Sequence, residues 1–121
     1  MNNLELSKKE AASIVLNSQL LDGKIKFSKG KNSFAEIINK LGYVQIDTIS
    51  VINRAHHHII WTRKNDYKEK HLHDLQTKDK LIFEYWTHAM SFIPMQDYKY
   101  ALPRMQNFNK PKSKWLKYRY N

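Results

Sequence analysis

The chain has 121 residues, a formal net charge of +10, and 41% hydrophobic and 26% charged residues. This composition is typical of one globular domain or part of a larger protein, and it excludes disordered, collagen-like and low-complexity classes. The sequence has no cysteine, which excludes a disulfide framework, a thiol nucleophile and a Cys-liganded zinc site.

Two helices are predicted at the start. Ser7-Lys8-Lys9-Glu10 is a capping box, in which Ser7 and Glu10 each accept from a backbone N–H of the other, and apolar residues follow at helical spacing. Ser33-Phe34-Ala35-Glu36 repeats the box, and Gly42 stands where a glycine commonly ends a helix.

The middle of the chain predicts a short strand and two more helices. Tyr43 to Asp47 alternates polar and apolar residues, so its polar side chains share one side of an extended segment. Apolar residues then recur at helical spacing from Ile49 to Ile60, and Asp66-Tyr67-Lys68-Glu69 is a third box-like helix start. Leu81 to Trp86 and Ala89 to Ile93 are β-rich runs.

A last helix is predicted near Met95 to Met105, interrupted by Pro103. The full order is helix, helix, strand, helix, helix, two β runs, helix. On a basic chain, this order favours a mainly α fold with a small β-hairpin, a winged helix-turn-helix. We expect a winged-helix domain over residues 1–109 and a basic aromatic tail or truncated linker over 110–121.

The positive charge is concentrated at the end of the chain. From Tyr98 to Asn121 there are seven cations and no acids, interleaved with aromatic residues. This pattern favours a nucleic-acid partner, although a solvated tail is an alternative. The candidates for phosphate contact are Arg54, Arg63, Lys110, Lys112, Lys114, Lys117 and Arg119.

No metal site or cofactor is predicted. His56-His57-His58 resembles a metal-binding tract, with His71 and His73 nearby. Successive helical residues point about 100° apart, however, so three adjacent histidines do not converge on one ion. Packing, hydrogen bonding or phosphate contact are the preferred roles.

Two polar clusters are candidates for chemistry. Gln45 and Asp47 lie at i and i+2 and project together from a strand, about 7 Å apart, so a carboxylate and a carboxamide can orient one water. The alternative is that Asp47 caps the next helix. Tyr85, Trp86 and His88 lie in the run Glu84-Tyr85-Trp86-Thr87-His88, which alternatively is a turn with core aromatics.

Together these blocks resemble a known family. Leu41-Gly42-Tyr43-Val44-Gln45-Ile46-Asp47-Thr48-Ile49, then Arg54-Ala55-His56, then Glu84-Tyr85-Trp86-Thr87-His88-Ala89 are similar to the N-terminal part of the AlkZ/YcaQ family of bacterial DNA glycosylases. The similarity extends from about Leu6 to Trp115. Family members are considerably longer and resemble tandem winged helices around duplex DNA, so the resemblance implies that this chain is an N-terminal portion, inactive alone.

The resemblance implies hydrolysis of the N-glycosidic bond of alkylated or crosslinked purines. Gln45-Ile46-Asp47 matches the family's proposed catalytic element, with Asp47 supplying charge and positioning a water that Gln45 helps to hold. Tyr85, Trp86 and His88 are expected to line or support the pocket, and Arg54 and His56 to contact the DNA backbone.

Two other interpretations stay open. The chain is alternatively a non-catalytic winged-helix DNA-binding module, for which charge and element order suffice. It is also interpretable as an interaction fragment that needs its missing C-terminal part to fold, and a homodimer through the face left by that part is then expected. We expect a cytoplasmic, nucleoid-associated protein without a membrane partner, because no apolar run approaches the roughly 20 residues of a membrane helix and the start does not resemble a signal peptide.

Overall fold

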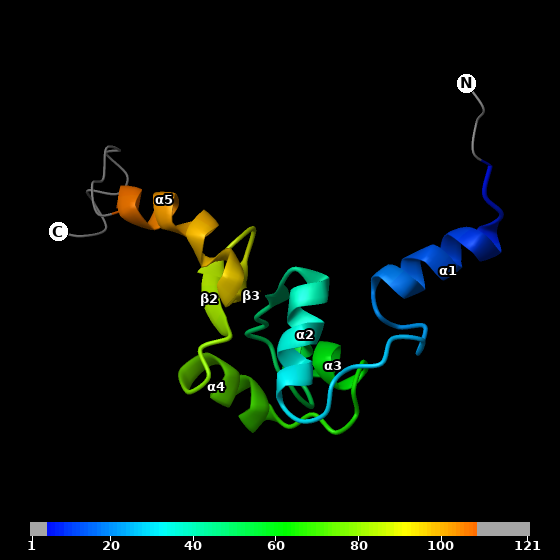
Figure 1. Ribbon diagram of the computed structural model, residues 1–121, viewed down its shortest axis with the longest axis horizontal. Coiled ribbons are helices and arrows are strands. Elements are labelled where there is room, and N and C mark those ends of the chain that lie inside the picture. The colour runs from blue at the N-terminus through cyan, green and yellow to red at the C-terminus, as the bar shows by residue number, and fades with distance from the viewer. Residues whose placement is uncertain (1–4, 109–121) are drawn as a thin grey trace.

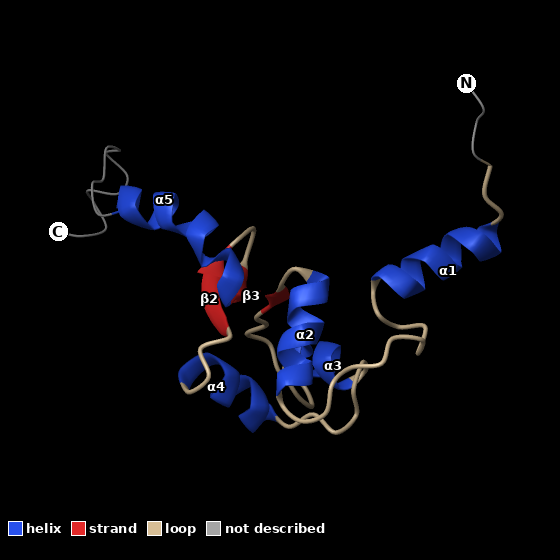
Figure 2. Ribbon diagram, in the orientation of Figure 1, coloured by secondary structure: helices blue, strands red, loops and turns tan. Residues whose placement is uncertain are grey.

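The computed structural model describes residues 5–108, which form five α-helices and one three-stranded antiparallel sheet (Figure 1, Figure 2). In chain order the elements are α1 (Lys8–Ser18), α2 (Asn32–Leu41), β1 (Val44–Gln45), α3 (Ala55–Trp61), α4 (Glu69–Thr77), β2 (Ile82–Trp86), β3 (Met90–Pro94), the 3₁₀ helix η1 (Met95–Asp97) and α5 (Tyr98–Phe108). This order agrees with the predicted one. The predicted domain boundary at 109–110 lies at the end of the described residues and stays a prediction.

The sheet joins the predicted hairpin to the predicted short strand. Its strand order is β1-β3-β2, and both pairings are antiparallel. Val44 pairs with Phe92 and Gln45 with Ser91, while β2 and β3 pair along their whole length. The N–H of Ile46 donates to the carbonyl of Met90 at 2.8 Å, one residue beyond β1. Strand β1, which contains Gln45, is therefore an edge strand held by hydrogen bonds to the central strand β3.

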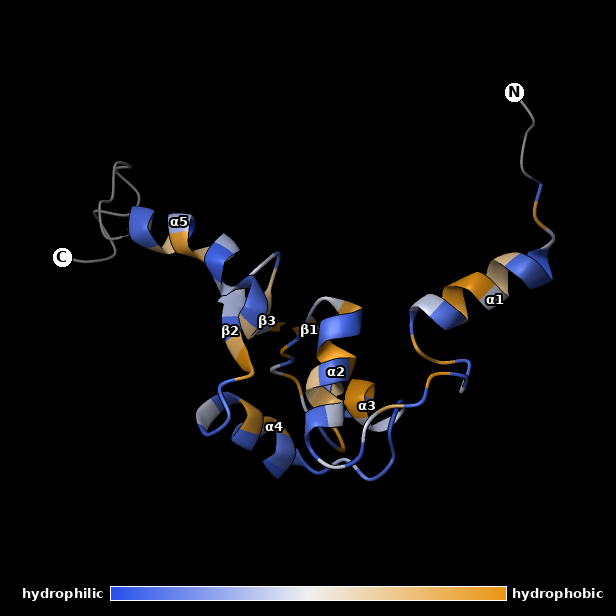
Figure 3. Ribbon diagram, in the orientation of Figure 1, coloured by the Kyte–Doolittle hydropathy of each residue, from blue (hydrophilic) through white to orange (hydrophobic). Residues whose placement is uncertain are grey.

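The core lies between the sheet and helices α2, α3 and α4. Phe34, Ile37 and Ile38 recur at the three- and four-residue spacing of a helix, so α2 buries one face against β3 and α4. Ile60 of α3 belongs to the same buried cluster, and both helices carry apolar segments in Figure 3. The other main core residues are Val44, Ile60, Leu72, Leu75, Ile82 and Phe92.

Only the first of the three predicted capping boxes forms. The N–H of Ser7 donates to Glu10 Oε2 at 2.9 Å, and the N–H of Glu10 donates back to Ser7 Oγ at 3.3 Å. The prediction at Ser33 is wrong, because Ser33 is already inside the first turn of α2 and its buried hydroxyl donates to the carbonyl of Gly30 at 2.6 Å. Gly42 does end α2, with a positive φ of 84°.

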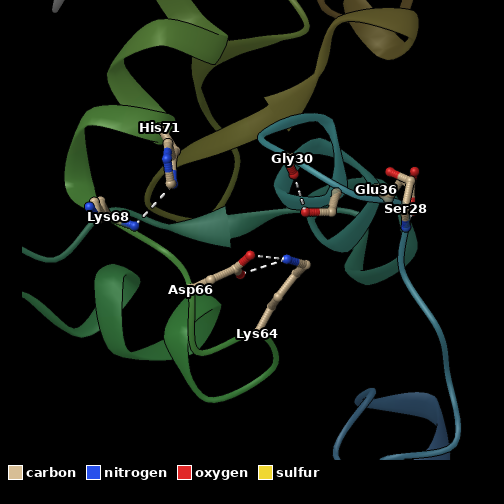
Figure 4. A network of polar contacts seen from close by, with 8 residues as sticks. Ser28, Gly30, Glu36, Lys64, Asp66, Lys68 and His71 are labelled. Carbon is tan, nitrogen blue, oxygen red and sulfur yellow. Dashed lines mark hydrogen bonds and ion pairs between the residues drawn. The ribbon is translucent and has the colours of Figure 1, made fainter.

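The third predicted start is also wrong. Helix α4 begins at Glu69, and the side chain of Asp66 instead forms an ion pair with Lys64 (Figure 4). At the helix start itself, the N–H of Lys68 donates to His71 Nδ1 at 3.1 Å. The charged ammonium of Lys64 competes for Asp66 more effectively than a backbone amide, because opposite charges strengthen a hydrogen bond.

Two helix boundaries also differ from the predictions. Helix α3 begins at Ala55, whereas the periodic pattern predicted helix from Ile49; residues 48–54 form a loop in which Val51 is 93% exposed. Helix α5 continues through Pro103, which was expected to interrupt it. Pro103 is exposed, so water can solvate the carbonyl that its missing N–H leaves without a partner.

Helix α1 stands apart from the other elements at one end of the molecule, with α5 at the other end (Figure 1). None of its side chains is buried, although Ile14, Val15 and Leu16 give it apolar character. The chain returns to the core at Leu20, and Arg63 Nε donates to the carbonyl of Gln19 at 2.9 Å. Between residues 5 and 108, no helix combines the length and apolar character that crossing a membrane requires.

Candidate active site

The two polar clusters predicted from the sequence meet at the open edge of the sheet. Gln45 is exposed on β1, and its Oε1 accepts a hydrogen bond from Nε2 of His88 at 3.2 Å. His88 lies in the turn between β2 and β3, and its ring packs edge-on against Tyr43 with centroids 5.4 Å apart. The antiparallel pairing of β1 with β3 causes this meeting, because it places the hairpin turn beside β1.

Asp47 follows β1 where the chain leaves the sheet. Its Oδ1 accepts from the N–H of Ile49 at 2.9 Å, which is the local turn that aspartate commonly forms. This is not the helix cap considered as an alternative, because α3 begins only at Ala55. Within residues 5–108, Oδ2 of this half-buried carboxylate has no hydrogen-bond partner, so one oxygen is free to accept from water.

His56 lies beneath this segment and takes one of the roles predicted for the histidines, hydrogen bonding, with a partner that the sequence did not indicate. The side chain of His56 is only 3% exposed. Its Nδ1 accepts a hydrogen bond from the N–H of Asp47, with a nitrogen-to-nitrogen distance of 3.1 Å. Burial, reinforced by the positive potential of His57, lowers the pKa of His56 to about 4. The predicted DNA-backbone contact is therefore dropped, because the structure places this uncharged ring inside the fold and away from the surface.

We expect His56 to make the fold sensitive to mild acid. Its pKa is lower in the folded chain, about 4, than its ordinary value of 6.5, so the unfolded chain binds the proton more readily. The free energy of unfolding is therefore highest above pH 6.5 and falls by about 3 kcal/mol as the pH decreases through about 4. Urea unfolding of the wild-type chain between pH 7.5 and 4 measures this loss.

The matched control for this prediction is His56→Asn, which cannot titrate in this range. Its stability should change less between pH 7 and 5 than that of the wild type. Carboxylates with lowered pKa values, such as Asp66 and Glu36, lose their contribution at lower pH because their ordinary values are 3.8 and 4.5. Equal pH slopes for the two proteins between pH 7 and 5 would contradict the prediction.

The aromatic residues of the second cluster lie on β2. Tyr85 pairs with Ser91, which also pairs with Gln45, so the three residues form one row across the sheet. Trp86 is exposed, and its carbonyl accepts from Arg104 Nη1 at 3.3 Å. The Arg104 guanidinium also lies 6.0 Å from the Tyr85 ring centroid. The sequence had not singled out Arg104, because its contact to β2 depends on how α5 folds back.

A hollow of about 380 Å³ opens beside Gln45. Among the described residues that line this hollow, Arg63 is the only one with a cationic side chain. Two guanidinium nitrogens of Arg63 donate to the carbonyls of Gln19 and Ile59, and burial lowers the pKa of this group. Asp47 does not line this hollow. Its other lining residues are Gln19, Leu41, Tyr43, Val44 and Ile59.

The remaining predicted site residues divide into two groups. Arg54 precedes α3 with an exposed side chain, where a phosphate can reach it. The tail cations lie outside the described residues: Lys110, Lys112, Lys114, Lys117 and Arg119.

In the described part of the chain, no three metal-ligating side chains form a group that could hold an ion. His57 instead places Nδ1 2.7 Å from the hydroxyl of Tyr67.

Comparison with known proteins agrees with the resemblance read from the sequence. The model of the AlkZ-like DNA glycosylase family matches residues 38–119, from the second half of α2 onward. The match contains Gln45, Asp47 and the Tyr85–His88 segment, whereas α1 lies outside it. No solved structure matches the chain. Because the match covers more than half of the sequence, the chain belongs to the AlkZ-like DNA glycosylase family.

Proposed function

We propose that this chain carries the catalytic motif of a DNA repair N-glycosylase that hydrolyses the bond between deoxyribose and an alkylated or crosslinked purine. Gln45 and Asp47 are the proposed catalytic residues, and His88, Tyr85 and Trp86 support the pocket. The protein would act on double-stranded DNA in the bacterial nucleoid. The observation that carries the proposal is the Gln45–His88 contact, which joins the two blocks that resemble the family at one edge of the sheet.

The chemistry requires few protein groups. A purine alkylated at N7 is cationic, so the C1′–N9 bond breaks with its electron pair going to N9 and the base leaves neutral. Positive charge then develops on the deoxyribose, and the carboxylate of Asp47 stabilises it. A water held by Asp47 and the carboxamide of Gln45 adds to C1′ and gives its proton to the carboxylate or to solvent.

The test is base release by the complete protein that carries this sequence. The protein is incubated with duplex DNA containing N7-methylguanine and then treated with alkali, which cleaves the strand at abasic sites. We expect strand breaks that depend on protein concentration, together with free N7-methylguanine. Intact strands at saturating protein would eliminate the glycosylase proposal. A duplex with a nitrogen-mustard crosslink tests the narrower substrate in the same assay.

A winged helix is the arrangement that we propose for residues 32–94. Helix α2, strand β1, helices α3 and α4 and the β2–β3 hairpin follow one another in the order of that motif, and β1 completes the sheet beside β3. This observation favours the second candidate function, a DNA-binding module without catalysis. Strand breaks after alkali distinguish the two functions.

Both DNA functions predict binding that is strongly weakened by salt. Each phosphate contact releases counterions, so a fourfold rise in salt, from about 50 to 200 mM, should weaken binding by at least about tenfold if two or more contacts form. Fluorescence anisotropy with a labelled duplex measures this dependence. Arg54→Gln should reduce the slope of log K against log salt by about one.

The matched control is Lys9→Gln, which removes one charge from exposed helix α1 outside the region matched by the family. Its slope should equal that of the wild type. A response to salt that is flat for all three proteins would contradict both DNA functions. The homodimer stays a prediction, for which sedimentation of the purified protein is the measurement.

A further inference from the structure

His56 is the side chain that holds the backbone of the proposed catalytic motif from inside the fold. The last contact of this segment with the sheet is the N–H of Ile46, which donates to Met90. The next N–H, that of Asp47, points away from the sheet and donates to His56 Nδ1 at 3.1 Å. Beyond it the chain enters the exposed 48–54 loop. His56 therefore extends the anchored part of the motif by the residue that carries the carboxylate.

The ring of His56 is held in place by other rings. Phe92 of β3 packs edge-on against it with centroids 5.8 Å apart, and His57 lies at 4.1 Å. His57 is in turn held by the Tyr67 hydroxyl, and Tyr67 packs against Phe34 of the core at 5.2 Å. This series of contacts connects the hydrophobic core to the backbone of Asp47.

The hydrogen bond also requires one protonation state of the ring. Nδ1 accepts only when its lone pair is free, so the proton is on Nε2 and the imidazole is neutral. Burial lowers the pKa of His56 and keeps this state near neutral pH. The charged and titratable groups around the ring are Asp47 after β1, Arg54 just before α3, His57 of α3, and Glu69, Lys70 and His73 of α4. From β3 only the apolar Phe92 faces this region.

We propose that His56 is a positioning residue, which fixes the carboxylate of Asp47 against the deoxyribose through the hydrogen bond from the Asp47 N–H to Nδ1. The effect on catalysis rests on the proposed function, whereas the hydrogen bond does not. A displacement of about 1 Å in a catalytic group can slow a reaction by roughly 100-fold. A backbone anchor at the residue that carries the carboxylate should therefore control the reaction rate and not the DNA affinity.

Two substitutions separate this role from simple packing. The carboxamide oxygen of Asn lies near the position of histidine Nδ1, whereas that of Gln lies nearer Nε2. His56→Asn should keep the acceptor for the Asp47 N–H, and His56→Gln should lose it. We expect His56→Gln to slow single-turnover base release by 10- to 100-fold at unchanged DNA affinity, and His56→Asn to stay within a few fold of the wild type.

The hydrogen bond itself is measured without catalysis. In ¹⁵N-labelled wild-type chain, we expect a scalar coupling between the Asp47 amide nitrogen and His56 Nδ1, and slow exchange of the Asp47 amide proton. Slow exchange should persist in His56→Asn and be lost in His56→Gln, with far-UV circular dichroism confirming that both fold. If His56→Gln does not fold, the coupling in the wild type decides whether the anchor exists.

The outcomes distinguish the two proposals. If the wild-type protein shows the coupling but never releases base, the anchor exists and the glycosylase proposal fails. If the wild-type protein releases base without any coupling, or if His56→Gln and His56→Asn release base at equal rates, the positioning role fails and the glycosylase proposal stands.

Discussion

Asp47→Asn is expected to slow base release by roughly 10²- to 10³-fold while leaving DNA affinity unchanged. The substitution removes the negative charge that would stabilise the cationic deoxyribose, but it keeps an oxygen at Oδ1. The turn in which Oδ1 accepts from the N–H of Ile49 should therefore survive. Single-turnover release of N7-methylguanine measures the first effect, and anisotropy with a labelled duplex measures the second.

The control is Glu5→Gln, which removes the same charge from an exposed side chain ahead of α1. Its base-release rate should match the wild type, because Glu5 lies outside the region that the family model matches. An unchanged rate in Asp47→Asn would end the catalytic assignment. Parallel loss of rate and DNA affinity would instead assign Asp47 to folding of the 43–49 segment.

Element order was predictable because it depends on local patterns. The spacing of Phe34, Ile37 and Ile38, the positive-φ glycine at Gly42 and the two β-rich runs each have a structural counterpart in α2 and the hairpin. Helix starts were less predictable. Ser33 and Asp66 have suitable side chains for capping, but a buried turn occupies one and a lysine pairs with the other. Competing partners of this kind are not visible in a linear pattern.

The site was only half predictable for a similar reason. Alternation placed Gln45 on an exposed strand, and family resemblance grouped it with His88, which the hydrogen bond between them now joins. Packing, hydrogen bonding or phosphate contact was predicted for the three adjacent histidines, but the pattern did not show that His56 is the buried acceptor of the Asp47 N–H. Its contact with Asp47 depends on α3 starting six residues later than the apolar spacing predicted.

Phe34→Ala is expected to lower the free energy of unfolding by about 3–5 kcal/mol, a large share of the roughly 5–15 kcal/mol that stabilises a typical domain. Phe34 is buried on α2, and its ring is stacked on His71 at 4.8 Å and lies edge-on to Tyr67 at 5.2 Å. Removing the ring therefore leaves a cavity between α2, α4 and the segment before α4. Urea unfolding at pH 7.5 measures the loss.

The effect should also reach the proposed site, because Tyr67 supports His57 and His57 lies against His56. We expect faster exchange of the Asp47 amide proton in Phe34→Ala than the loss of global stability alone explains. Tyr100→Ala is the control, since it removes an aromatic ring that is exposed on α5 and should cost no more than about 0.5 kcal/mol. Equal destabilisation by the two substitutions would contradict the position of Phe34 at the centre of the core.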